Sequence, residues 1–164
     1  MCSSDEKKPK LLIVDDNPNE MNSLAIGLRL EGFDAEGVES GKAALEALDK
    51  AQYAVVLIDL MMPEMNGLQL ARRIKEAYPD AFTIMMSAYH LSPVQLAKAD
   101  TGVVGFVPKP FRFEELVVFI RSKLNAEQLP VMSSDYASTG ISQKAEIPVV
   151  IGEMDIQRPA TPGS

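Results

Sequence analysis

A short apolar run that ends in a single carboxylate constrains this chain more than any other feature. Residues 54–58 are all apolar, and Asp59 follows them directly. An apolar run of this length without alternation is typical of a parallel strand buried on both faces. Pro63 fixes its own φ and Asn66–Gly67 tolerates positive φ, so we expect a loop before a helix that begins at Leu68. Ligands of open parallel α/β sheets bind beyond the carboxyl ends of the strands, which makes Asp59 the first candidate functional residue.

Strand and helix patterns alternate along most of the chain. Strands are predicted at 10–14, 34–38, 54–58, 81–86 and 103–107. Each is followed by a helical pattern, with caps such as Asn17–Pro18, Ser40 and Ser92–Pro93, and the fourth helix is expected to run to about Asp100. This alternation predicts a parallel sheet with helices on both faces. The expected fold class is a doubly wound α/β domain with five parallel strands in the order 2-1-3-4-5.

Composition narrows the function classes. The 164 residues are 46% apolar and 24% charged, which suits one globular domain with an appendage. A formal net charge of −7 argues against nucleic acid as the main ligand. No apolar run approaches the ~20 residues that span a bilayer, and residues 1–10 lack the apolar core of a secretory signal. Cys2 is the only cysteine, so an intrachain disulfide is impossible and a cytoplasmic location is expected.

The two ends of the chain differ from its middle. We expect residues 1–9 to be disordered, residues 10–125 to form the domain and residues 126–164 to form a flexible, low-complexity tail. Within the tail, residues 147–151 are apolar and β-prone. They form either an adhesive patch in a disordered tail or a segment that docks on this domain or on a partner. The tail is too short for a winged helix, so no DNA-binding domain is expected.

Four of the predicted strands end in groups with distinctive chemistry. The first ends in Asp15–Asp16, the third in Asp59, the fourth in Ser87, and the fifth leads to Lys109. In the order 2-1-3-4-5 the first and third strands are neighbours, so three carboxylates would share one crevice. Two unit charges ~4 Å apart repel by roughly 4 kcal/mol at an effective dielectric of 20. A cluster of oxygen ligands of this kind suits Mg²⁺, with Lys109 as a second positive charge.

Taken singly, these residues have ordinary explanations. An Asp pair at a strand end is usually a turn or cap feature, a Ser after a strand is usually a turn residue, and a Lys between prolines is usually a surface residue. The ordered set, with each member at the end of its own strand, is what indicates chemistry. A carboxylate nucleophile, a divalent metal, a lysine and a hydroxyl together predict phosphoryl transfer through an aspartyl phosphate.

The sequence resembles the receiver domain of bacterial two-component response regulators, the CheY-like, flavodoxin-like family. The resemblance covers roughly residues 9 to 124. It is carried by four pieces, which are Ile13-Val14-Asp15-Asp16, Asp59 with Met62-Pro63-Glu64-Met65-Asn66-Gly67, Met86-Ser87-Ala88, and Phe106 with Lys109-Pro110-Phe111.

The resemblance implies a role for each matching residue. Asp59 is the expected phosphoacceptor. Asp15, Asp16, Asp59 and the backbone carbonyl of Met61 are the expected Mg²⁺ ligands. Lys109 is expected to pair with the phosphoryl group, Ser87 to move toward it and Phe106 to swing inward behind it. By the same resemblance, the Lys109–Pro110 bond is expected to be cis, and Met61 and Tyr89 are expected to flank the path of attacking water.

Three residues depart from the commonest family pattern. Ser87 stands where Thr is more frequent and keeps the hydroxyl. Phe106 stands where Tyr is more frequent, so the ring has no hydrogen bond to offer when it faces outward. Pro108 removes a ladder donor, which an edge strand tolerates, and the fifth strand is expected to be an edge. These departures leave the chemistry in place and bear on the size of the conformational response.

Three functions follow from different premises. The first is a switch that accepts a phosphoryl group from a histidine kinase or phosphotransfer protein and then binds a downstream protein, with homodimerisation as an option. The second is a pseudo-receiver, a binding module that works without phosphate, which the intact acidic residues and Lys109 disfavour. The third is an aspartate-nucleophile phosphatase of the haloacid dehalogenase kind. That class needs an acid two residues after the nucleophile, and Met61 occupies that position, so we do not expect an enzyme.

Overall fold

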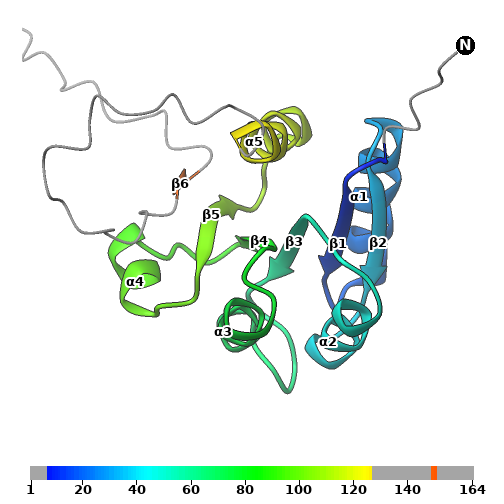
Figure 1. Cartoon of the computed structure of the whole chain (residues 1–164). Helices are drawn as coiled ribbons and strands as arrows, with labels where there is room; N and C mark the ends of the chain where they lie inside the picture. Colours follow the sequence, from blue (N-terminus) through cyan, green and yellow to red (C-terminus); the bar gives the residue numbers. More distant parts are fainter. Residues whose placement is uncertain (1–6, 127–148, 151–164) are drawn as a thin grey trace, which may run out of the picture.

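The computed structural model describes residues 7–126 and 149–150, in which strands and helices alternate (Figure 1). The element bounds, in chain order, are β1 (Lys10–Val14), α1 (Pro18–Leu30), β2 (Asp34–Val38), α2 (Gly41–Lys50), β3 (Val55–Asp59), α3 (Gly67–Ala77), β4 (Phe82–Ser87), α4 (Pro93–Lys98), β5 (Val103–Pro108), α5 (Phe113–Ala126) and β6 (Val149–Val150). Most of the predicted flexible tail and most of the predicted disordered N-terminus lie outside the described residues, but Val149–Val150 within the predicted tail form the strand β6.

The described strands form one parallel sheet in the order β2-β1-β3-β4-β5-β6. Its first five members confirm the predicted order 2-1-3-4-5. β1 lies between β2 and β3, so the sheet grows first to one side of β1 and then to the other. The carboxyl ends of β1 and β3 therefore flank the topological switch point, where ligands of this fold class bind.

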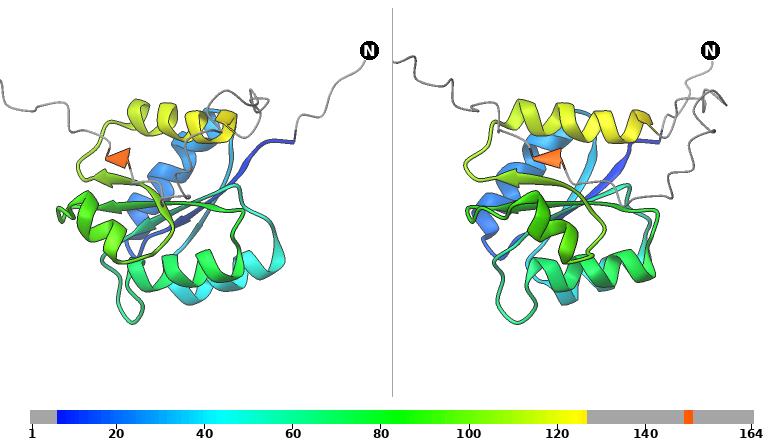
Figure 2. Two further views of the ribbon diagram at one scale, coloured as in Figure 1. Left: turned by 60° about the vertical axis from the view of Figure 1, so that its left-hand side comes forward. Right: turned by 90° about the vertical axis from the view of Figure 1, so that its left-hand side faces the viewer.

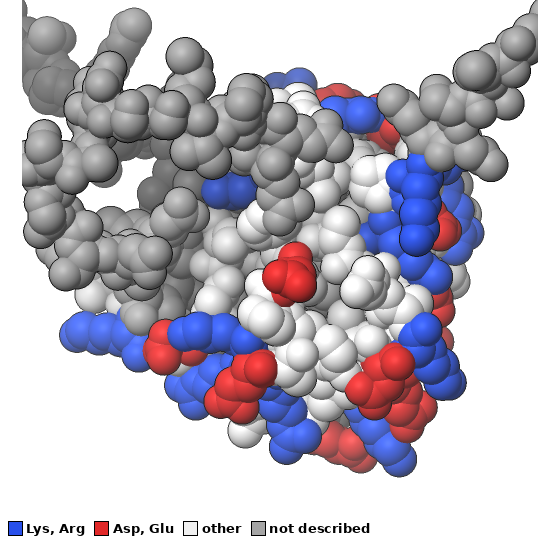
Figure 3. Space-filling view, in the orientation of Figure 1, with Lys and Arg blue, Asp and Glu red and all other residues white. Residues whose placement is uncertain are grey.

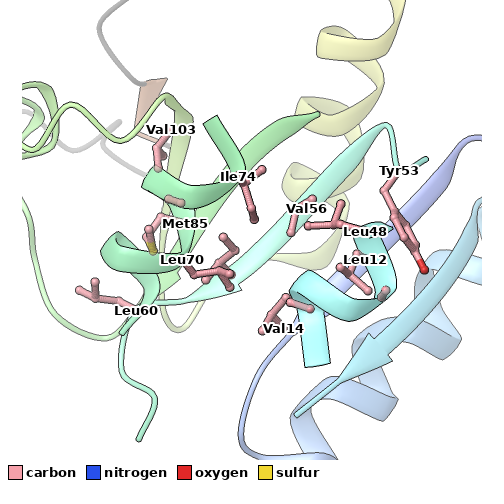
Figure 4. Close-up of a cluster of buried hydrophobic side chains, with 14 of the residues drawn as sticks. Leu12, Val14, Leu48, Tyr53, Val56, Leu60, Leu70, Ile74, Met85 and Val103 are labelled. Carbon is pink, nitrogen blue, oxygen red and sulfur yellow. The ribbon is translucent and has the colours of Figure 1, made fainter. Parts of the chain in front are cut away.

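Helices cover both faces of the sheet (Figure 2). On one face, apolar side chains of α2 and α3 pack on the sheet in a cluster that includes Leu48, Leu70, Ile74 and Phe106, and Figure 4 shows how most of these side chains converge. On the other face, α1 and α5 pack through a second cluster. The five residues of β3 are buried throughout, as expected for a central strand between two layers.

Polar side chains fix where three helices begin. The side chain of Asn17 caps α1 and that of Ser40 caps α2, as predicted. Asn66 caps α3 in a capping box with Gln69, whose side chain accepts a hydrogen bond from the Asn66 N–H. The helix thus begins at Gly67, one residue before the predicted start, because the Asn66–Gly67 pair serves as a cap.

The β3–α3 loop has its left-handed residue at a position for which the sequence predicted no special backbone conformation. Asn66–Gly67 tolerates positive φ, but Asn66 has φ −72° and the left-handed residue of this loop is Glu64, with φ 67°. Gly67 is needed for a different reason. A Cβ at this position would lie 2.7 Å from the backbone oxygen of Asp59 and 2.9 Å from the Cα of Leu60. Glycine therefore lets α3 begin directly against the end of β3.

The region around β5 differs from the prediction in two ways. The helix α4 ends at Lys98, about two residues before the predicted end, and Asp100 has a positive φ of 49°. The fifth strand is also not an edge, because β6 pairs with it in parallel. That pairing involves Gly105 and Phe106 only, so Pro108 lies beyond it and costs the β5–β6 ladder no donor.

Charged side chains of both signs are interspersed along the lower and right-hand rim of the face drawn in Figure 3. Two ion pairs link neighbouring elements. Lys75 of α3 pairs with Asp100 beyond α4, and Arg121 of α5 pairs with Glu31 at the end of α1. Among the described helices, none combines the length and apolarity needed to cross a membrane.

Candidate functional site

Three carboxylates meet at the carboxyl ends of β1 and β3. Val14 and Ile58 are register partners, so Asp15 and Asp59 follow neighbouring strands at the same level. One oxygen from each of Asp15, Asp16 and Asp59 lies within 4.8 Å of the others. Asp15 and Asp59 are buried, whereas Asp16 is exposed. The predicted convergence of these carboxyl groups is therefore what the structure shows.

Lys109 brings a cation to the same crevice from the loop after β5. Its Nζ lies 3.2 Å from Oδ2 of Asp15 and 3.7 Å from Oδ2 of Asp59. The Lys109–Pro110 peptide bond is cis, as expected. The backbone N–H of Lys109 donates to the carbonyl oxygen of Ser87, at 2.8 Å. This bond holds the start of the loop against the end of β4, which directs the lysine toward the carboxylates.

Glu20 is a fourth acidic member of the site, and sequence reasoning missed it. Its Oε2 lies 2.7 Å from Nζ of Lys109, closer than either aspartate. Its Oε1 accepts a hydrogen bond of 3.1 Å from the side chain of Asn17. A signal was present, because Glu three residues after an N-cap lies in the first turn of the helix. That turn of α1 begins at the carboxyl edge of the sheet, where Lys109 is.

Burial and charge shift the pKa values of two groups here. Burial raises the pKa of the Asp59 carboxyl above its ordinary value, and the charge of Asp15 adds to the increase while Lys109 opposes it. Burial lowers the pKa of the Lys109 ammonium, but the hydrogen bond to Glu20 and the charges of Asp59 and Asp15 outweigh burial, so that this pKa is raised. Lys109 therefore stays cationic, and it lies beside Asp59, whose ionised form is disfavoured by burial.

The predicted switch residues line the neighbouring strands. Ser87 is fully buried at the end of β4, and its Oγ accepts a hydrogen bond of 2.9 Å from the N–H of Tyr89. Phe106 of β5 is buried in the cluster between the sheet and α3. Its strand neighbour in β4 is Met85, two residues before Ser87. Ser87 and Phe106 thus lie on adjacent strands, offset by two residues in register.

The two residues predicted to flank the path of water are exposed, and each comes two residues after a residue of the site, Met61 after Asp59 and Tyr89 after Ser87. The side chains of Met61 and Tyr89 are 54% and 61% exposed. The N–H of Met61 points back into the site and donates to Oδ1 of Asp59 over 3.4 Å. The backbone of Met61 is therefore next to the central carboxylate, while its side chain is free to contact solvent.

The donor set fits a small divalent cation. Three carboxyl groups carry more negative charge than one lysine offsets, and their oxygens are close enough to share one ion. All of the side-chain donors are carboxylate oxygens, and they are few, so water would complete the coordination of a bound ion. Mg²⁺ prefers this arrangement, whereas Zn²⁺ and copper prefer nitrogen or sulfur ligands.

A doubly wound parallel sheet with acidic groups and a lysine at its switch point defines the class of receiver domains. Residues 11–121 match the family described as Response regulator receiver domain, and the chain belongs to that family.

Curated relatives are similar over this region. The DNA-binding response regulator MtrA of Mycolicibacterium smegmatis is 33% identical over 124 residues, which are 76% of this chain and 54% of the relative. The heme response regulator HssR of Staphylococcus aureus is 36% identical over 113 residues, which are 69% of this chain and 50% of the relative. The chain thus spans about half the length of these relatives.

Solved structures share the fold. A CheY-like receiver domain protein from Methanospirillum hungatei superposes with a TM-score of 0.70 at 23% identity, covering 74% of this chain and 98% of that one. The response regulator TrrA from Thermotoga maritima, solved in complex with Mg²⁺ and beryllium fluoride, gives a TM-score of 0.63 at 30% identity, covering 70% of this chain and 98% of that one. A relative of this fold thus holds the metal that the acidic site suits.

Proposed function

We propose that this chain is a phosphorylation-activated signalling switch with Asp59 as the phosphoacceptor. The observation that carries the proposal is the convergence of Asp59, its two acidic neighbours and Lys109 at the switch point of a receiver fold. Asp59 lies close to the other two carboxylates, its Oδ2 is 3.7 Å from Nζ of Lys109, and its Oδ1 accepts a hydrogen bond from the N–H of Met61. The donor is a phosphohistidine of a histidine kinase or phosphotransfer protein, and the exchange takes place in the cytoplasm.

The transfer step uses the Asp59 carboxylate as a nucleophile. One Oδ forms a bond to phosphorus while the phosphorus–nitrogen bond of the donor breaks, and the electron pair stays on the imidazole. Mg²⁺, held by Asp15, Asp16, Asp59 and the carbonyl of Met61, would supply charge stabilisation for the phosphoryl oxygens. Lys109 supplies a further positive charge within reach of Asp59. Hydrolysis of the acyl phosphate resets the protein, and Met61 and Tyr89 control the approach of water.

The switching step uses Ser87 and Phe106. The new phosphoryl group draws the Ser87 hydroxyl away from the N–H of Tyr89, and Phe106 follows. Hydrogen bonds to charged groups contribute about 1.5–3 kcal/mol each. A shift from 1:99 to 99:1 needs about 5.5 kcal/mol. The bonds from Ser87 and Lys109 together contribute about 3–6 kcal/mol, so they reach this value near the upper end of the range. The face made by α4, β5 and α5 then changes shape and binds a downstream protein.

Incubation with acetyl phosphate and Mg²⁺, followed by intact-protein mass spectrometry, tests the proposal. We expect the wild type to gain the mass of one phosphoryl group and Asp59→Asn to gain none. Asp100→Asn is the matched control, because that aspartate pairs with Lys75 outside the site, and it should gain the same mass as the wild type. A folded wild type without the mass increase would leave the pseudo-receiver as the better description.

A further inference from the structure

The outer edge of β5 is occupied by two residues from a distant part of the chain. Val149 pairs with Gly105 and Val150 pairs with Phe106, in parallel register. Without β6, β5 would end the sheet and would expose a row of backbone N–H and C=O groups to solvent. An edge of that kind accepts an extended segment by strand addition. In this structure the segment that it accepts belongs to the same chain.

The position of β6 gives this pairing its significance. Figure 2 shows β6 beside β5, with α5 above it and α4 below it. β6 therefore lies in the middle of the surface formed by α4, β5 and α5. β6 also pairs with β5 at Phe106. On its other side Phe106 pairs with Met85 of β4, two residues before Ser87.

The chain geometry favours occupation by the same molecule. A parallel crossover from β5 to β6 needs a dozen or more residues, and the segment from α5 onward provides them, because 22 residues (127–148) separate Ala126 from Val149. A tethered segment has an effective concentration in the millimolar range, so even a short ladder becomes populated. The sequence suits the role, since two β-branched residues form β6 and Pro148 precedes them.

We propose that the edge of β5 at Gly105 and Phe106 is a strand-docking site whose occupant is the chain's own Val149–Val150 segment. The segment acts as an internal competitor for the surface made by α4, β5 and α5. A protein that binds this surface must displace β6, so its apparent affinity is reduced by the fraction of molecules in which the edge is free. This last consequence rests on the proposed function, whereas the docking itself does not.

Backbone amide exchange in the full-length protein tests the docking. In the double variant Val149→Pro/Val150→Pro, β6 loses its N–H donors and cannot form the ladder. We expect exchange of amides in residues 104–107 to become roughly five- to tenfold faster than in the wild type, because about half of them point away from β4. The matched control is Ser133→Pro/Ser134→Pro, which makes the same change outside β6 and should exchange like the wild type. Equal exchange in all three proteins would overturn the proposal.

A dilution series separates the chain's own segment from that of a second copy. Protection that stays constant from high to low protein concentration supports docking within one molecule. Protection that disappears on dilution, together with a dimer in sedimentation, would show that a second copy supplies β6 and would overturn the proposal.

Acetyl phosphate treatment of the same samples keeps this proposal separate from the proposed function. If Asp59 fails to gain a phosphoryl group while the exchange difference persists, the proposed function fails and the docking stands. If Asp59 is phosphorylated but the double-proline variant exchanges like the wild type, the docking fails and the switch stands.

Discussion

At the scale of single residues, the site is a compromise between charge and burial. Asp59 is 9% exposed and has two acidic neighbours, so its ionised form is disfavoured in the folded protein. Lys109 offsets only part of this cost, since it is shared between Asp15, Glu20 and Asp59. A bound cation would offset the rest of this cost, because it favours the ionised form of the carboxylates and so stabilises the folded protein.

The raised pKa of Asp59 gives the first prediction. The folded protein binds the Asp59 proton more tightly than the unfolded chain, so the free energy of unfolding falls as pH rises from the ordinary value of 3.8 through the raised pKa. Asp59→Asn removes this dependence. In EDTA at neutral pH we expect the variant to be more stable than the wild type by about 1 kcal/mol. Urea unfolding across acidic to neutral pH measures the difference, which should shrink toward acidic pH; a difference that is independent of pH would contradict the prediction.

Glu20 gives the second prediction. Because it competes with Asp59 for Lys109 and repels an anionic donor, Glu20→Gln should speed phosphorylation by acetyl phosphate. Removing one partly exposed ion pair is worth about 0.2–1 kcal/mol, so the rate should rise by a factor of about 1.4 to 5. The rate of mass increase under excess donor measures this. Glu31→Gln, which breaks the pair with Arg121, is the control and should leave the rate unchanged. A slower Glu20 variant would show that Glu20 helps the reaction.

At the scale of elements, much of the structure was predictable because each signal is local. The apolar run before Asp59 predicted a buried strand, and Asn17, Ser40 and Ser92 predicted caps that the structure shows. The predictions that were wrong concern features that depend on contacts between elements. Asn66–Gly67 suited a turn and a cap equally, and the approach of α3 to β3 decided between them.

The residues of the site divide in the same way into those that the sequence predicted and those that it did not. The carboxylates and Lys109 were found because strand order alone brings them together. Glu20 was missed because its role depends on how far the lysine side chain extends across the first turn of α1. The sequence around Val149 left two alternatives open, since a β-prone segment shows its partner only when an unpaired edge is known.

The capping box of α3 gives a prediction at this scale. Asn66→Ala removes the acceptor for the Gln69 N–H and should lower the free energy of unfolding by about 1 kcal/mol. Asn22→Ala, at an exposed position inside α1, should change it by less than about 0.5 kcal/mol or raise it slightly. Chemical denaturation of both variants measures these free energies. Equal effects would show that the Asn66 cap contributes no more to stability than an ordinary exposed side chain.

At the scale of the whole molecule, metal binding and folding are linked. An ion that binds only the folded state stabilises it, by about 2.7 kcal/mol at a hundred times its Kd. We therefore expect Mg²⁺ to raise the melting temperature of the wild type and to have little effect on Asp15→Asn/Asp16→Asn. Thermal unfolding in EDTA and in Mg²⁺ measures this. Replacing Mg²⁺ by an equal ionic strength of Na⁺ is the control, and an equal shift with Na⁺ would indicate screening instead of a bound ion.

Position 67 shows how a residue without functional groups can limit variation at a chemical site. Any side chain there would push the first turn of α3 off the backbone of Asp59 and Leu60. Deep mutational scanning would therefore score position 67 as intolerant as the phosphoacceptor itself, although it contributes nothing to the reaction. A ranking of catalytic importance drawn from such tolerance data would place this glycine among the reactive residues.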